Sequence, residues 1–229
     1  MGFLKKFFRN VFHEDAIPPL NSSFETLTDE ELEAHLSVRN YGQFTLTDAV
    51  RPSYDLEVVP SAGFRHDTYR DEAAQQDVPV LMAAVSREEL FETFMEVIEP
   101  LGPVVDVVLE TSHDYGSAGH SDLYREHIDM PILQSILWDF EDLLTNDGCT
   151  GIAVLNPQRP QEVQFDEHKL LIVYGKDLSE YEQAFQRCDL PCREEMQFIT
   201  EAEHVHSTRD EYQERFEELK MHLGMDSEG

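Results

Sequence analysis

Histidine and carboxylate side chains gather in residues 112–129, and these side chains can bind a divalent transition metal. His113, His120 and His127 lie seven residues apart in this segment, and four acidic residues lie among or beside them. Imidazole and carboxylate ligands together suit zinc or a similar ion. The segment is therefore a candidate metal site.

Two further histidines, His204 and His206, are separated by one residue. In an extended segment, alternate side chains point to the same side, so both imidazoles face one way. If the fold brings His206 toward His113, three ligands and an open position form a centre that activates water for hydrolysis. A metal-dependent hydrolase is thus one alternative function, with His113, His120, His127 and His206 as metal ligands and His204 beside them.

The same segment is also compatible with a polar surface loop. The chain has ten histidines and 47 acidic residues, so a histidine near a carboxylate is common without a metal. The His-Glu-x-x-His pattern of helical zinc sites does not occur, nor does a Gly-x-Ser-x-Gly elbow, a phosphate loop or a dinucleotide fingerprint. The main prediction is therefore a protein without catalytic activity or cofactor, with a zinc centre as the alternative.

Residues 3–13 have the pattern of an amphipathic helix. Its apolar face consists of Phe3, Leu4, Phe7, Phe8, Val11 and Phe12. The opposite face carries Lys5, Lys6 and Arg9. Such a helix suits an anionic membrane surface or the apolar groove of a partner protein. Docking on the acidic body of its own chain is a further possibility.

The net charge narrows the class of partner. The chain has 17 basic and 47 acidic residues, which gives a formal charge of −30. Binding of nucleic acid through this acidic body is excluded, because phosphate contacts need clustered Lys and Arg. A protein partner with a basic surface fits the charge, which would set the rate and specificity of association.

These features predict a non-catalytic interaction or regulatory protein that attaches to a membrane surface or a protein partner through residues 1–13. A structural subunit of a larger complex is a further alternative. No apolar run reaches the length of a membrane span, and the first dozen residues lack the apolar core of a secretory signal. We therefore predict a cytoplasmic protein, with peripheral membrane attachment as an option.

The elements that must position these residues point to an α+β fold. Strands are predicted over 104–110, 150–155 and 168–174, and one long helix over 131–145. From residue 104 the order of strands and helices is that of a ferredoxin-like β-α-β-β-α-β unit, with helices on one face of the sheet. Extra helices at both ends and the amphipathic arm complete the predicted fold.

The chain divides into three parts on composition. We predict an amphipathic arm and linker over 1–23, a small helix/strand segment with a loose loop over 24–79, and an α+β core domain over 80–229. The loose loop is residues 60–79, which are polar and show no clear period.

Overall fold

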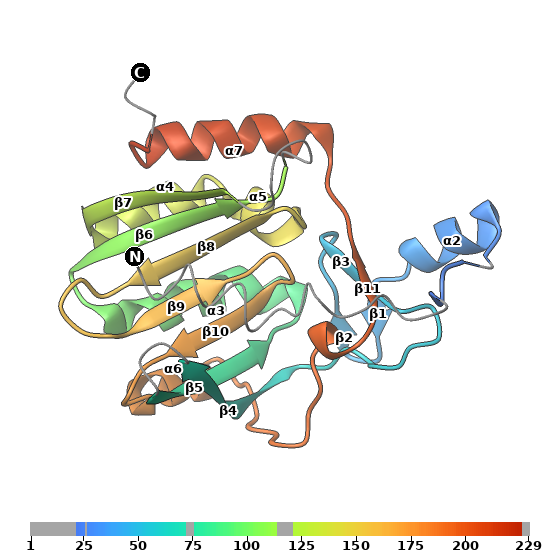
Figure 1. Ribbon diagram of the computed structural model, residues 1–229, viewed down its shortest axis with the longest axis horizontal. Coiled ribbons are helices and arrows are strands. Elements are labelled where there is room, and N and C mark those ends of the chain that lie inside the picture. Colours follow the sequence, from blue (N-terminus) through green and yellow to red (C-terminus); the bar gives the residue numbers. More distant parts are fainter. Residues whose placement is uncertain (1–21, 26, 72–75, 114–120, 226–229) are drawn as a thin grey trace.

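The computed structural model describes residues 22–25, 27–71, 76–113 and 121–225. They form a mixed α+β fold around a seven-stranded antiparallel sheet of order β4-β5-β10-β9-β8-β6-β7 (Figure 1). The strands are β4 (Gly63–Asp71), β5 (Gln76–Ala84), β6 (Val104–Thr111), β7 (Ser121–Asp129), β8 (Thr150–Leu155), β9 (Glu162–Phe165) and β10 (Leu170–Tyr174). The predicted α+β class is confirmed.

Five helices share one hydrophobic core with the sheet. They are α3 (Arg87–Ile98), α4 (Met130–Trp138), α5 (Glu141–Asn146), α6 (Ser179–Arg187) and α7 (Asp210–His222). Helices α3 to α6 lie behind the sheet in Figure 1, and α7 runs beside its β7 edge, next to α5. Alternate residues of β6, namely Val105, Val107 and Leu109, point into this core. Each fully buried side chain of this kind stabilises the fold by roughly 1.5–3 kcal/mol.

Part of the opposite face of the sheet is covered by a small second layer. Its elements are α2 (Asp29–Leu36), β1 (Asn40–Tyr41), β2 (Phe44–Thr45), β3 (Val50–Pro52) and β11 (His204–His206). The structure also has two short 3-10 helices, η1 (Glu99–Leu101) and η2 (Ile199–Glu201). Phe44 and Phe198 pack here against Met82 and Ile172 of the sheet. Strand β11 pairs antiparallel with β3. This layer therefore ties the N-terminal segment to a late part of the chain.

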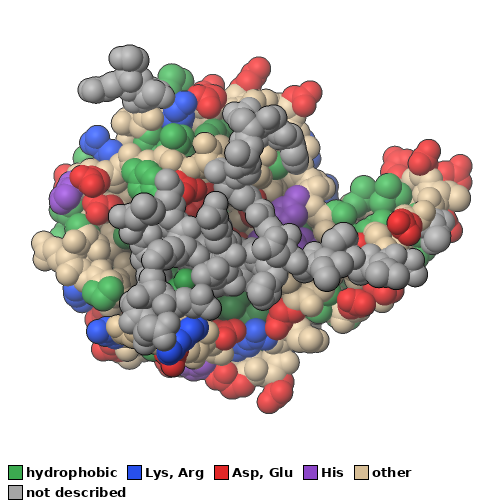
Figure 2. Space-filling model, viewed as in Figure 1, with side chains coloured by type: hydrophobic (Ala, Val, Ile, Leu, Met, Phe, Trp, Pro, Cys, Tyr) green, Lys and Arg blue, Asp and Glu red, His purple; other side chains and the backbone are tan. Residues whose placement is uncertain are grey.

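The lobe that carries α2 is strongly acidic. Helix α2 begins with Asp29, Glu30 and Glu31 after the N-cap Thr28, whose capping box with Glu31 is formed. Figure 2 shows the acidic side chains of this lobe together at one end of the molecule. Negative side chains suit the positive start of a helix, which explains their place in the first turn.

Two segments that the sequence predicts as loops are the edge strands of the sheet. Residues 63–71, within the predicted loose loop 60–79, form β4, and residues 121–129 form β7. Strand β5 spans position 80, where the core domain was predicted to begin. Both edge strands carry many charged residues on their exposed side, which is typical of sheet edges.

The predicted ferredoxin-like topology is not confirmed. The sheet has seven strands, and β8, β9 and β10 follow one another as antiparallel neighbours. The single helix predicted over 131–145 is instead two helices, α4 and α5, separated at Asp139 and Phe140. No helix of the described ranges is long and apolar enough to cross a membrane.

Candidate metal centre

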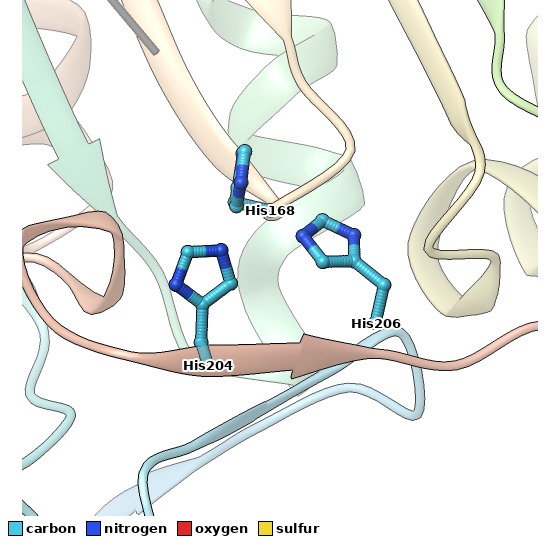
Figure 3. Close-up of side chains that lie close together, drawn as sticks. All are labelled: His168, His204 and His206. Atoms are coloured by element: carbon cyan, nitrogen blue, oxygen red, sulfur yellow. The ribbon is translucent and has the colours of Figure 1, made fainter. Parts of the chain in front are cut away.

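Three histidines from two distant parts of the chain converge at one end of the large sheet. His168 lies in the turn between β9 and β10, and His204 and His206 lie on β11. One ligand atom from each side chain lies within 4.8 Å of the other two. Figure 3 shows the three rings pointing toward one another. Small side-chain movements would bring all three to the zinc–nitrogen distance of about 2.0–2.1 Å.

Each of these rings is oriented by a hydrogen bond at Nδ1. His204 Nδ1 lies 2.8 Å from the carbonyl oxygen of Ala202, and His206 Nδ1 lies 2.8 Å from that of Gly148. His168 Nδ1 lies 2.9 Å from a carboxylate oxygen of Asp166. Because a carbonyl oxygen only accepts, Nδ1 of His204 and His206 must carry the proton. Nε2 is then the ligand atom, as in metal-binding histidines held by an acceptor behind the ring.

Burial keeps two of these rings neutral. It lowers the pKa of His204 and of His206 to about 4, and the nearby His168 adds to the effect by charge repulsion. His168 is buried, whereas His204 and His206 are partly exposed. Metal ions bind neutral imidazole, so these rings need lose no proton at neutral pH. Solvent can also reach one side of the group.

The turn that carries His168 is built around Asp166. One carboxylate oxygen of Asp166 accepts from the backbone N–H of Leu170 at 2.8 Å, and the other faces His168. The Asp166 N–H donates to the carbonyl oxygen of Leu170, and Lys169 adopts φ +64° to close the turn. The carboxylate thus fixes the backbone and the imidazole together.

The position of His206 depends on a glycine that allows close backbone packing. A Cβ on Gly148 would lie 2.5 Å from the carbonyl oxygen of Ala49, so another residue would push the chains apart. The Gly148 N–H donates to the carbonyl oxygen of Ser207 at 2.9 Å, while its own carbonyl oxygen faces His206. This contact fixes β11 against the segment before β8.

A second group of possible metal ligands includes Asp147 and Cys149, the two sequence neighbours of Gly148. Nε2 of His113 lies 2.8 Å from a buried carboxylate oxygen of Asp147, which also accepts from Thr150 Oγ1. Burial raises the pKa of Asp147, but the hydrogen bonds from His113 and Thr150 outweigh it and the net pKa is lowered. His113, Asp147 and Cys149 could together hold an ion. His113 therefore belongs to this group and not to the three-histidine group.

The other histidines of the predicted ligand set lie elsewhere. His127 is on the edge strand β7 with its side chain 67% exposed, and its ring is 3.7 Å from Asp106. His120 and the whole arm, residues 1–13, lie outside the described residues. Of the predicted set, only His206 is in the three-histidine group, together with His204.

His168 is the residue that sequence reasoning missed. It stands at the beginning of a predicted strand, where a histidine is an ordinary residue. The one local signal is Asp166, placed two residues earlier at a turn between two apolar strands. An acidic residue beside a histidine in a tight turn can orient the ring from behind.

No protein-family model, curated protein or solved structure matches this chain. The geometry of the site is therefore the basis for its function.

Proposed function

We propose that this chain binds a zinc ion, or a similar divalent transition metal, through Nε2 of His168, His204 and His206. The observation that carries the proposal is that three convergent imidazoles each have Nδ1 held by an oxygen acceptor. Imidazole is a common ligand of zinc, copper, nickel and iron, and three of them suit a tetrahedral zinc centre. The ligand set differs from the one predicted from the sequence, which centred on the 113–129 loop.

The number of protein ligands supports a catalytic centre over a structural one. Among the described residues, no fourth histidine, cysteine or carboxylate belongs to this group. Structural zinc sites are closed by four protein ligands, whereas catalytic sites keep one position for water or substrate. We therefore propose a metal-dependent hydrolase, in which the ion lowers the pKa of a bound water toward about 7.

The first test is metal stoichiometry. Purified protein is loaded with zinc, dialysed and analysed by mass spectrometry for metal. We expect one tightly bound zinc per wild-type chain and none in His204→Ala. His127→Asn is the matched control, because it removes an exposed histidine and asparagine tolerates the positive φ of 56° at this position. Equal zinc in the wild type and His204→Ala contradicts the proposal.

The second test separates metal binding from hydrolysis. Zinc-loaded protein is assayed with nitrophenyl esters and phosphate esters, and the rate is followed against pH. We expect zinc-dependent turnover that rises with the ionisation of a group near pH 7 and that His206→Ala abolishes. Stoichiometric zinc without turnover of any of these esters would leave a metal-binding protein and overturn the hydrolase.

Attachment through residues 1–13 to a membrane surface or a basic protein partner stays a prediction. The arm lies outside the described residues.

A further inference from the structure

A cavity of about 370 Å³ lies at the opposite end of β9 from the three histidines. It is bounded by the starts of β5 and β9, the ends of β8 and β10, and the loop that joins β8 to β9. These parts of the strands lie on the left of the sheet in Figure 1. Small-molecule sites have volumes of about 300–1,000 Å³, so this cavity has the size of a ligand site. Its apolar wall consists of Val78, Leu155, Pro160 and the ring of Tyr174.

One buried carboxyl group lines this cavity. Glu162 is 3% exposed, and its carboxyl accepts a hydrogen bond from the side-chain amide of Gln164. Burial raises the pKa of Glu162 to about 8, although the Gln164 hydrogen bond opposes this. In the part of the chain that the structure describes, no Lys or Arg forms an ion pair with Glu162. A buried carboxyl without a cation destabilises a fold, and such groups gather at functional sites.

Two cations lie at the exposed side of the same cavity. Arg159 and Lys176 are exposed residues of its lining, and within the described ranges neither forms an ion pair. Nearby, Oε1 of Gln161 is buried and accepts no hydrogen bond from a described residue. The cavity thus offers acceptors in its interior and positive charge at its mouth.

We propose that this cavity binds a small zwitterion whose ammonium group lies against Glu162 and whose carboxylate lies between Arg159 and Lys176. The hydrocarbon part of the ligand would pack on Val78 and Leu155. An amino acid with its two charges separated by methylene groups has this chemistry. The ammonium group favours the ionised form of Glu162, so the carboxyl releases its proton when the ligand binds, and each charged group of the ligand then meets an opposite charge. The apolar wall contributes through the area removed from water. The site is independent of the metal centre.

The test uses three probes of similar length and different charge. These are 6-aminohexanoate with both charges, hexanoate with the negative charge, and hexylammonium with the positive charge. Binding to the full chain is measured by titration calorimetry at pH 7. We expect 6-aminohexanoate to bind at least tenfold more tightly than either of the other two. Absence of binding by 6-aminohexanoate, or equal binding by either singly charged probe, overturns the proposal.

Variants assign the two ends of the ligand. Glu162→Gln keeps the shape of the side chain, and it should weaken 6-aminohexanoate to the level of hexanoate. The double variant Arg159→Ala with Lys176→Ala should weaken it to the level of hexylammonium. These two cations are exposed, so the double variant tests the proposal even if Glu162→Gln fails to fold. The control is Arg193→Ala, which removes an exposed arginine outside the cavity and should leave binding unchanged. Unchanged binding of 6-aminohexanoate in the double variant overturns the proposal.

Discussion

Two groups of side chains in this protein bring histidines close to other possible metal ligands, and they shift histidine pKa values in opposite directions. In the three-histidine group, burial lowers the pKa of His204 and of His206 to about 4. At the β4 edge of the sheet, His66 lies between two carboxylates, with Nε2 3.0 Å from Glu182 and Nδ1 2.7 Å from Glu194. Hydrogen bonds to Glu182 and Glu194 raise the pKa of His66.

The difference shows that closeness alone does not make a metal site. His66, Cys192 and Glu194 are close enough together to hold an ion, and all three are exposed. A ring that donates from both nitrogens to carboxylates is an imidazolium and has no lone pair to offer. A neutral ring with an acceptor at Nδ1 offers Nε2 to a metal. The partner of the second nitrogen therefore decides between a proton and a metal ion.

The largest expected effect that follows from this comparison is on thermal stability in zinc. A ligand that binds the folded state at about 100 times its Kd stabilises it by about 2.7 kcal/mol. For a chain of this size, that raises the Tm by roughly 5–10 °C. We expect this shift in the wild type and in His66→Ala, and its loss in His206→Ala. Differential scanning fluorimetry with zinc, and with a chelator as reference, measures it.

The opposite result for the two variants contradicts the placement of the metal at the three histidines. A zinc-dependent rise in Tm that survives in His206→Ala but disappears in His66→Ala would place the metal at the exposed group. Excess magnesium in every sample removes weak binding of divalent ions to the acidic surface.

A smaller effect is expected from the carboxylate behind His168. In Asp166→Asn, an NH2 group, which only donates, replaces one carboxylate oxygen. The remaining oxygen is needed to accept from the Leu170 N–H, so the NH2 group faces His168 Nδ1 and cannot accept its hydrogen bond. The ring then turns over or changes its tautomer, and zinc affinity should fall about 10–100-fold. Competition with a chromophoric chelator measures the Kd. Glu167→Gln is the control in the same turn, because the carboxylate of Glu167 accepts a hydrogen bond from Ser112. An equal loss of zinc affinity in both variants would show that the turn as a whole was disturbed.

The sequence predicted the centre of the sheet better than its edges. Strands over 104–110 and 150–155 agree with β6 and β8, because central strands are buried on both faces and show as continuous apolar runs. β4 and β7 have one neighbour each, and their polar side chains point to solvent. Their strand conformation comes from pairing with a neighbour, which no local pattern records.

The metal centre shows the same limit of local reasoning. The spacing of His204 and His206 predicted two imidazoles on one side of a strand, and both belong to the group that the structure brings together. His168 joins them because β11 pairs with β3 and lies across the end of the β9–β10 turn. That approach depends on the packing of two sheets, so spacing within 113–129 was a poor guide to the third ligand.

The smallest expected effect is on stability against pH in the metal-free protein. In the unfolded chain His206 has the ordinary histidine pKa near 6.5, so between about pH 4 and 6.5 it carries a proton there but not in the folded state. This residue therefore makes the free energy of unfolding fall as the pH falls, by about 1.4 kcal/mol per pH unit. His66 has a raised pKa, so the stability that it contributes is present below about pH 6.5 and is lost as the pH rises through the folded pKa. Its contribution is weaker than that of His206, because its side chain is 46% exposed. The measurement is urea unfolding from pH 5 to 7.5 with a chelator present. As the pH falls, His206→Gln should gain stability relative to the wild type, and His66→Gln should lose stability relative to it. Relative changes of the same sign in both variants would mean that the two groups do not shift histidine pKa values in opposite directions.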